Sequence, residues 1–225
     1  MDKNKIFFKN NVDFYSEEYR DYTLKPWERL IVESVNGYVL DVACGGGRIT
    51  VPMLRRGCNV VGTDFIKEFE PKIRQHEQEF KGDFKFIESE MTALPFRDKS
   101  FDAVSCVNSI IYLKDISEIR VAIKEMSRVI KPGGKLFITS WNLWHPLWGI
   151  SVVLNYILRR GRSFGATSPF NTTDNRLNNS KTYMFVPTRK ALKAICKEVG
   201  LDCTIKTGDG KPFCPILVIE GSKGV

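Results

Sequence analysis

Short apolar runs, rich in β-branched and aromatic residues, alternate along this chain with segments of helical periodicity. The apolar runs are "YVLDVAC" (38–44), "CNVVGTDF" (58–65), "DFKFIES" (83–89), "FDAVSCVN" (101–108), "KLFITSW" (135–141), "CTIKTG" (203–208) and "FCPILVIEG" (213–221). Alternation of this kind is typical of βαβ units, so we expect a doubly wound α/β fold with a mostly parallel, seven-stranded sheet. A "DGKP" turn alone separates the last two runs, which predicts a hairpin and an antiparallel last strand.

The segments between these runs carry helix signals. They are 26–35, which opens with a proline, 48–56, 116–130, which "KPGG" should stop, and 188–200, which ends at a glycine. From Asn142 to Pro187 the rhythm breaks into a Trp-rich, helix-like run and then a polar loop, "SFGATSPFNTTDNRLNNSKT". We therefore expect an N-terminal helical cap over residues 1–34 and an α/β domain over 35–225, with an insertion at about 142–187.

Length and composition agree with one globular domain. The chain has 225 residues, of which 43% are hydrophobic and 27% charged. Its N-terminus lacks the apolar core of a signal peptide, and no apolar stretch approaches the roughly 18 residues of a membrane span, so we expect a cytoplasmic protein. Six scattered cysteines without a CxxC pair, together with only two histidines, favour neither a disulfide framework nor a metal site.

The segment "VLDVACGGGRIT" (39–50) has the form of a cofactor seat. A strand ending at Cys44, three glycines and a helix starting near Arg48 place backbone N–H groups at the carboxyl edge of the sheet. Asp41 precedes these glycines and would repel a pyrophosphate, and no phosphate-binding lysine follows as in a P-loop. This glycine turn therefore suits a cationic ligand better than a polyphosphate.

A second acid ends the next predicted strand. Asp64 lies 64 − 45 = 19 residues after Gly45, where a carboxylate would accept both hydroxyls of a ribose. Together with "ESEMTALPFRDKSFDAVSCVNSIIYLKD" (88–115) and "RVIKPGGKLFITSW" (128–141), these segments resemble class I S-adenosylmethionine-dependent methyltransferases of the ubiquinone-biosynthesis or "type 11" kind. The resemblance covers roughly Val39 to Trp141 and implies a Rossmann-like methyltransferase fold.

The resemblance also implies a set of cofactor-binding residues. The family's D-x-G-x-G-x-G turn falls on Asp41, Ala43, Gly45 and Gly47, with alanine in place of the first glycine and Cys44 inside the turn. On the adenosine side, Asp64 would bind the ribose diol, Phe65 would lie beside the adenine, Glu90 would meet the N6 amine, and the Met91 N–H would meet a ring nitrogen.

Two further groups complete this implied site. The end of the fourth strand would line the methionine moiety through backbone carbonyls of Cys106, Val107 and Asn108. Tyrosines of the N-terminal segment, Tyr15, Tyr19 and Tyr22, would close over the cofactor.

The implied reaction transfers a methyl group from S-adenosylmethionine, which becomes S-adenosylhomocysteine, to an O, N or C nucleophile of a small or lipid-like acceptor. It needs no protein nucleophile and no metal, because the sulfonium already activates the methyl group and the protein orients the reactants. A general base would assist some acceptors, and Tyr112, His145 and Asp115 are the candidates near the carboxyl edge of the sheet. We expect the insertion to bind the acceptor.

Alternative functions remain open. Between Trp141 and Lys190 there are seven basic residues and one acid, a balance that also suits RNA, and similar cores with "TSW" after the fifth strand modify tRNA. The Trp- and Arg-containing segment 141–162 also suits peripheral contact with a membrane. "CVNSIIY" (106–112) lacks the motifs of DNA-base methyltransferases, so we expect no DNA substrate. A non-catalytic partner subunit is the alternative outside enzymes, and the oligomeric state stays open.

Overall fold

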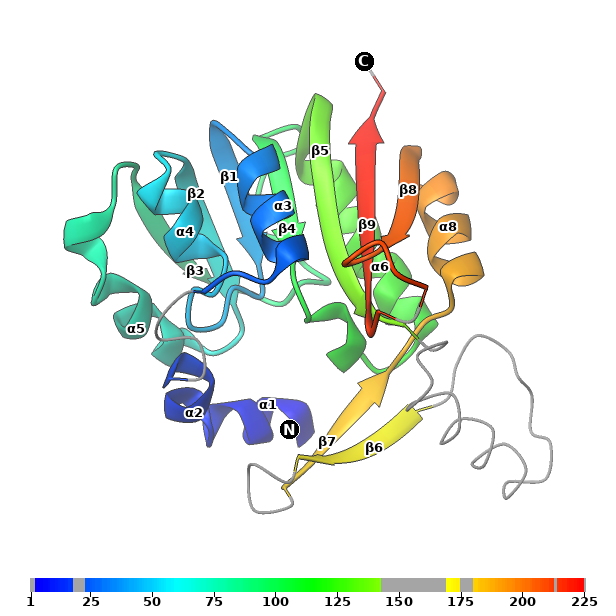
Figure 1. Cartoon of the computed structure of the whole chain (residues 1–225), viewed down its shortest axis with the longest axis horizontal. Coiled ribbons are helices and arrows are strands. Elements are labelled where there is room, and N and C mark those ends of the chain that lie inside the picture. The colour runs from blue at the N-terminus through cyan, green and yellow to red at the C-terminus, as the bar shows by residue number, and fades with distance from the viewer. Residues whose placement is uncertain (1–2, 18–22, 143–168, 175–179, 213, 225) are drawn as a thin grey trace.

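A computed structural model describes residues 3–17, 23–142, 169–174, 180–212 and 214–224 (Figure 1). Its main sheet has seven strands in the order β3-β2-β1-β4-β5-β9-β8. These strands are β1 (Tyr38–Val42), β2 (Asn59–Asp64), β3 (Phe84–Glu88), β4 (Phe101–Cys106), β5 (Ile130–Trp141), β8 (Leu201–Thr207) and β9 (Ile216–Lys223). Strands β1 to β5 pair in parallel, whereas β9 is antiparallel to both β5 and β8. The predicted sheet, including its antiparallel last strand, is confirmed.

Helices cover both faces of this sheet (Figure 1). The α-helices are α1 (Lys3–Lys9), α2 (Val12–Glu17), α3 (Pro26–Ser34), α4 (Thr50–Arg55), α5 (Glu70–Arg74), α6 (Ile116–Val129) and α8 (Arg189–Glu198). Three short 3-10 helices join them: η1 (Lys67–Phe69), η2 (Glu77–Glu79) and η3 (Ile110–Tyr112). Alternate residues of a strand face opposite layers, so Phe137 packs in the cluster with α3 and α4, whereas Leu136 and Ile138 pack in the cluster with α6 and α8.

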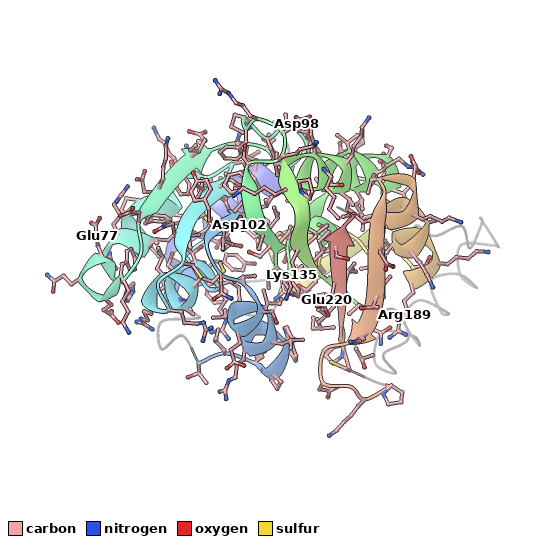
Figure 2. The ribbon with its side chains drawn as sticks, turned by 90° about the horizontal axis from the view of Figure 1, so that it is seen from above. Glu77, Asp98, Asp102, Lys135, Arg189 and Glu220 are labelled. Atoms are coloured by element: carbon pink, nitrogen blue, oxygen red, sulfur yellow. The ribbon has the colours of Figure 1, made fainter. Side chains whose placement is uncertain are left out.

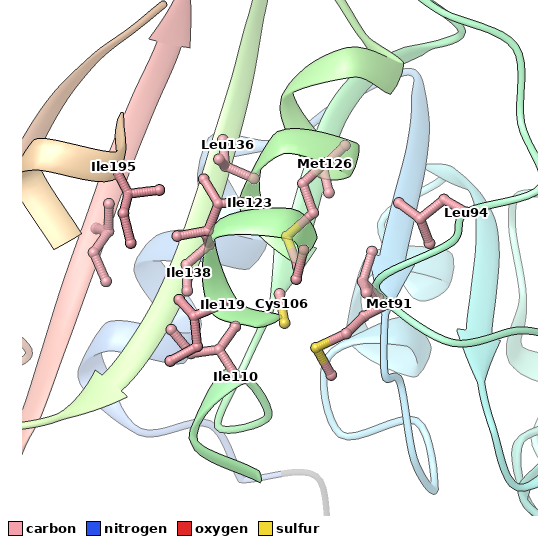
Figure 3. Close-up of a cluster of buried hydrophobic side chains, with 14 of the residues drawn as sticks. Met91, Leu94, Cys106, Ile110, Ile119, Ile123, Met126, Leu136, Ile138 and Ile195 are labelled. Carbon is pink, nitrogen blue, oxygen red and sulfur yellow. The ribbon is translucent and has the colours of Figure 1, made fainter. Parts of the chain in front are cut away.

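The larger core cluster lies between the sheet and helices α6 and α8 (Figure 3). Ile119, Ile123 and Met126 from α6 have no exposed surface, and they meet Leu136 and Ile138 of β5. The helical spacing of these α6 residues gives one continuous apolar face. This packing fixes the carboxyl ends of β4 and β5.

The carboxyl ends of the parallel strands meet at one edge of the sheet, on the side of α1 and α2 in Figure 1. Strand β1 lies between β2 and β4, so the connections leaving β1 and β4 diverge there and open a crevice, as in other doubly wound sheets. Figure 2 looks onto the opposite edge, where Asp102 accepts hydrogen bonds from Lys131 Nζ (2.6 Å) and the Tyr38 N–H (2.8 Å).

Two expectations about local structure were wrong. Strand β5 begins at Ile130, directly after α6, so the "KPGG" stretch lies inside the strand, with a register shift against β4 between Phe101 and Ala103. The expected polar loop instead contains a second antiparallel sheet, made of β6 (Pro169–Asp174) and β7 (Ser180–Phe185). The Trp-rich run at 143–168 lies outside the described residues.

Strand β7 lies beside α1 and η3, next to the carboxyl edge of the main sheet (Figure 1). The N-terminal helices and part of the expected insertion therefore meet at the same end of the molecule. In the described residues, no helix is both long and apolar enough to cross a bilayer.

Candidate functional site

The glycine turn after β1 adopts a left-handed backbone at several positions. Ala43, Gly45 and Gly47 have φ values of 55°, 51° and 88°. A Cβ on Gly45 would meet no atom within 4 Å, whereas one on Gly46 would lie 3.0 Å from Ser16 Cα of α2. The turn is therefore open at Gly45 and covered by α2 at Gly46.

Asp41 lies almost fully buried beneath this turn. Its carboxylate accepts hydrogen bonds from Thr50 Oγ1 (2.6 Å) and Ser105 Oγ (2.7 Å). Burial raises the pKa of Asp41 to about 6, although both hydroxyl donors oppose the shift. The carboxylate thus connects β1 to the first turn of α4 and to β4, and it places negative charge behind the glycines.

Asp64, at the end of β2, holds the turn from the other side. The Gly45 N–H donates to its Oδ2 (3.0 Å), and the Ile66 N–H donates to its Oδ1 (3.0 Å). Burial is the main cause that raises the pKa of this carboxyl to about 6, and the nearby Asp41 charge adds to it. Two buried carboxylates therefore flank one open glycine turn, an arrangement that favours a ligand with hydroxyl donors or positive charge.

The loop after β4 forms the third wall. Asn108 has a left-handed backbone, with φ of 55°. Its N–H donates to Thr139 Oγ1 (2.7 Å), and that hydroxyl donates to Asn108 Oδ1 (3.0 Å). Ser109 Oγ donates to the Val107 carbonyl (2.8 Å). These bonds fix the strained loop against the end of β5, so its backbone faces the crevice in one conformation.

A cavity lies between these three elements and the N-terminal helices. It is lined by Phe8, Tyr15, Asp41, Ala43, Cys44, Gly45, Gly46, Arg48, Ile49, Asp64, Phe65, Phe69, Met91, Val107, Asn108, Ser109 and Tyr112. The lining combines aromatic and aliphatic side chains with few polar groups, as small-molecule sites do.

Aromatic side chains of α1 and α2 close one side of the cavity. The Phe8 ring packs edge-on against Tyr112 (centroids 4.8 Å apart) and Phe65 (6.2 Å), and it lies 5.2 Å from the Tyr15 ring. Asn4 Nδ2 donates to the Tyr112 carbonyl (2.8 Å). The two helices are therefore packed on the site through η3 and the segment after β2.

A buried ion pair supports the turn from the α3 side. Arg48 Nη2 lies 2.5 Å from Glu28 Oε2, its Nε donates to Glu28 Oε1 (3.2 Å), and Nη2 also donates to the Thr23 carbonyl (2.6 Å). Glu28 accepts from the Lys25 N–H (2.8 Å) as well, which caps α3. The guanidinium thus ties the glycine turn to the start of α3 through one carboxylate, and both side chains of this ion pair are largely withdrawn from water.

The structure brings most of the predicted cofactor residues to the cavity wall. These are Tyr15, Asp41, Ala43, Cys44, Gly45, Asp64, Phe65, Met91, Val107 and Asn108, with the candidate base Tyr112. Gly47 stands behind the wall, where a Cβ would lie 2.9 Å from Ile73, and Cys106 is fully buried in the core. Burial raises the pKa of the Cys106 thiol well above its usual range, as expected for an inert cysteine.

Two other predicted residues, Glu90 and Asp115, do not line the cavity. Glu90 is not among the lining residues, and its side chain is 57% exposed. Asp115 is the N-cap of α6, where its carboxylate accepts from the Ser117 and Glu118 N–H groups, away from the cavity. Tyr19, Tyr22 and His145 lie outside the described residues.

Sequence reasoning missed several lining residues: Phe8, Gly46, Arg48, Ile49, Phe69 and Ser109. Phe8 is separated from the glycine turn by more than thirty positions, and nothing in its local sequence marks it as a site residue. Arg48 carried a usable signal, because a charged residue directly after a glycine turn needs a partner once the turn is buried.

A family model described as a methyltransferase domain matches residues 40–138, which run from β1 to β5 and hold the glycine turn, Asp64 and the β4 loop. This part of the chain is similar to the methyltransferase domain family. The resemblance expected from the sequence is thereby confirmed.

Several curated relatives are named as quinone methyltransferases. A demethylmenaquinone methyltransferase of Renibacterium salmoninarum is 37% identical over 60% of this chain and 56% of its own length. A ubiquinone biosynthesis O-methyltransferase of Xanthomonas oryzae pv. oryzae is 34% identical over 54% of this chain and 50% of its own length. The chain thus spans about half the length of the curated relatives it matches.

Solved structures match the fold over nearly the whole chain. A SAM-dependent methyltransferase from Methanosarcina mazei has a TM-score of 0.68 at 21% identity, covering 90% of this chain and 99% of its own. The glycopeptide N-methyltransferase MtfA, solved with S-adenosylmethionine, has a TM-score of 0.65 at 17% identity, covering 88% and 93%. At these identities the likeness shows the fold alone.

Proposed function

We propose that this chain transfers a methyl group from S-adenosylmethionine to an O, N or C nucleophile of a small, lipid-like acceptor. The observation that carries the proposal is Asp64, a buried carboxylate at the end of β2 that is bonded to Gly45 in the open turn. A ribose diol supplies the hydroxyl donors that such a carboxylate accepts. The residues of the cavity therefore fit the adenosine and the cationic end of this cofactor.

Each wall of the cavity has a role in this proposal. Asp64 accepts the ribose hydroxyls, while the open backbone at Gly45 admits the amino-acid end, toward which Asp41 directs negative charge. The fixed loop at Asn108 presents backbone carbonyls to the reacting centre. When bound, S-adenosylmethionine supplies a sulfonium that makes its methyl group electrophilic, so the protein contributes orientation and the exclusion of water.

The acceptor side is formed by aromatic residues. Phe8, Tyr15 and Tyr112 line the cavity, and β7, from the expected acceptor-binding insertion, lies beside η3, which ends at Tyr112. Such surroundings favour a flat or apolar acceptor. The names of the curated relatives, demethylmenaquinone and ubiquinone methyltransferases, support the same class. Tyr112 is the candidate base that remains at the cavity wall.

Calorimetry with S-adenosylhomocysteine tests the cofactor assignment. We expect micromolar binding by the native protein and a loss of at least about tenfold in Asp64→Ala, since hydrogen bonds to a charged group are worth roughly 1.5–3 kcal/mol. Asp98→Ala is a matched control, because Asp98 pairs with Arg128 at the opposite edge of the sheet (Figure 2). Absence of binding, or equal binding in Asp64→Ala, would reject the assignment.

A labelled-methyl assay tests the acceptor class. Labelled S-adenosylmethionine is offered with cell extract separated into small molecules, lipids and RNA, and we expect label in the lipid or small-molecule fraction. Label in RNA, with binding that weakens steeply as salt rises, would favour the tRNA alternative. Cofactor binding without transfer to any fraction would favour a non-catalytic partner subunit.

A further inference from the structure

A lysine of α1 lies beside two residues that the resemblance assigns to the adenine. Of these three residues Phe65 lines the cavity, whereas Lys5 and Glu90 lie outside its lining. Lys5 Nζ lies 3.5 Å from Glu90 Oε1 and 5.6 Å from the centroid of the Phe65 ring. Under the proposed function, on which this inference rests, Glu90 and Phe65 are the residues that meet the adenine. Helix α1 therefore places a hydrogen-bond donor next to the residues that are expected to contact the adenine.

The chemistry of adenine matches this pair of side chains. Adenine presents an N6 amino donor with a ring-nitrogen acceptor on each side, N1 and N7. A carboxylate only accepts hydrogen bonds and an ammonium only donates them. Glu90 and Lys5 side by side thus present one acceptor and one donor, complementary to N6 and a neighbouring ring nitrogen.

The choice between the two ring nitrogens follows from the chain. The Met91 N–H, directly after Glu90, is the group expected to meet N1, and Met91 lines the cavity. Lys5 comes from α1, a different element from the segment that carries Glu90 and Met91. We propose that Lys5 is a specificity-determining residue of the cofactor site, donating a hydrogen bond to adenine N7 while Glu90 accepts from N6.

Other contacts hold Lys5 at this place. Asn4 donates to the Tyr112 carbonyl, and Phe8 packs between Tyr112 and Phe65, one turn of α1 later. Lys9 pairs with Glu68 (3.2 Å), which fixes the end of the helix to η1. The position of Lys5 is thus set by α1 as a whole, and its ammonium lies 3.5 Å from Glu90 Oε1.

Calorimetry with two forms of the product separates this role from simple packing. S-adenosylhomocysteine and its 7-deaza analogue, which has C–H in place of N7, are titrated into the native protein, Lys5→Met and Lys9→Met. Methionine keeps the length of the side chain over Phe65 but removes the donor. Lys9→Met removes a cap ion pair of the same helix without altering the groups near the adenine, so it is the matched control.

We expect the native protein to bind the 7-deaza analogue about 5-fold more weakly, a modest value for a half-exposed charged hydrogen bond. Lys5→Met should bind S-adenosylhomocysteine about 5-fold more weakly than the native protein and should bind the two ligands equally. Lys9→Met should keep the native ratio between the two ligands, whatever its absolute affinity.

Discrimination retained in Lys5→Met would overturn the role of Lys5, as would equal affinities of the native protein for the two ligands. Tighter binding of S-adenosylhomocysteine by Lys5→Met would also overturn it, because the lysine would then occupy space that the base needs. Failure of the native protein to bind S-adenosylhomocysteine would instead reject the proposed function itself. The two failures are therefore distinguishable.

Discussion

The two buried carboxylates of the site accept hydrogen bonds from different kinds of donor. Asp41 accepts from the Thr50 backbone N–H and from the hydroxyls of Thr50 and Ser105, and these two hydroxyls can rotate and act as acceptors instead. Asp64 is held by the N–H groups of Gly45 and Ile66, which can only donate. An amide side chain is therefore compatible with the surroundings of Asp41 and not with those of Asp64.

Asp41→Asn should change how the free energy of unfolding depends on pH. The pKa of Asp41 is about 6 in the fold against about 4 in the unfolded chain, so the fold binds more protons in this window and its native stability falls as pH rises. The unfolding free energy of Asp41→Asn, minus that of the native protein, should therefore rise by about 2–3 kcal/mol from pH 4 to 7. Urea titrations at both pH values measure this difference, and a constant difference would contradict it.

Asp64→Asn should behave differently at neutral pH. Its amide NH₂ would face a backbone N–H of Gly45 or Ile66 and leave that donor without an acceptor. At pH 7 we expect the free energy of unfolding of Asp64→Asn to be about 1–3 kcal/mol lower than that of Asp41→Asn. The same urea titrations compare the two variants, and equal stabilities would show that the turn relaxes around the amide.

Ala43 stands in a left-handed conformation where the family's turn has glycine. The φ of 55° costs an alanine about 1–2 kcal/mol. A glycine would remove this cost, but its greater freedom in the unfolded chain would cancel part of the gain. Ala43→Gly should therefore raise the free energy of unfolding by about 0.5–1 kcal/mol. Thermal and urea unfolding check this, and a loss of stability would mean that the packing of the Ala43 methyl outweighs the strain.

At the scale of elements, the sequence predicted what its apolar pattern determines. Every strand of the main sheet overlaps one of the apolar runs of the sequence, although β3 and β8 are only partly buried. The β6–β7 pair was not predicted, because Asn, Thr, Asp, Ser and Lys occupy more than half of its positions. The early start of β5 was hidden by Pro132 and two glycines, which ordinarily mark a turn.

Some residues of the candidate site could be predicted from the sequence and others could not. Asp41, Gly45 and Asp64 were predictable because they lie at strand ends, which a parallel sheet gathers at one edge. Phe8 and Lys5 were not, because their position depends on how α1 packs against η3 and the segment after β2. Long-range packing of a short helix leaves no local pattern in the sequence.

The contact between α2 and the glycine turn gives a prediction for one element. A Cβ at position 46 would lie 3.0 Å from Ser16 Cα. Gly46→Ala should therefore weaken the packing of α1 and α2 against the glycine turn by about 1–2 kcal/mol, while the sheet stays folded. Limited proteolysis should then cut residues 3–17 roughly 10-fold faster. Gly45→Ala is the control, since its Cβ meets no atom within 4 Å and only its backbone is strained. Equal cleavage of both variants would contradict the steric explanation.

For the whole molecule, cofactor binding should appear as thermal stability. S-adenosylhomocysteine at about 100 times its Kd should stabilise the fold by about 2.7 kcal/mol, which raises the melting temperature by roughly 5–10 °C in a chain of this size. Asp64→Ala should lose most of this shift, and Asp98→Ala should keep it. A scan of all three proteins at one ligand concentration measures it, and an equal shift in all three would place the ligand elsewhere.

The position of β9 has a consequence for how the protein is made. Among the described strands, β8 pairs with β9 alone, and β9 inserts between β8 and β5. Because β9 follows β8 in the chain, α8 and β8 are synthesised before the strand that joins them to the rest of the sheet. The edge of β5 and the apolar face of α8 therefore cannot reach their native surroundings until β9 is available, and a chain that lacks β9 would expose both to aggregation and to chaperones. Strands β1 to β5 could still pair in such a chain, whereas β8 would have no partner in the main sheet.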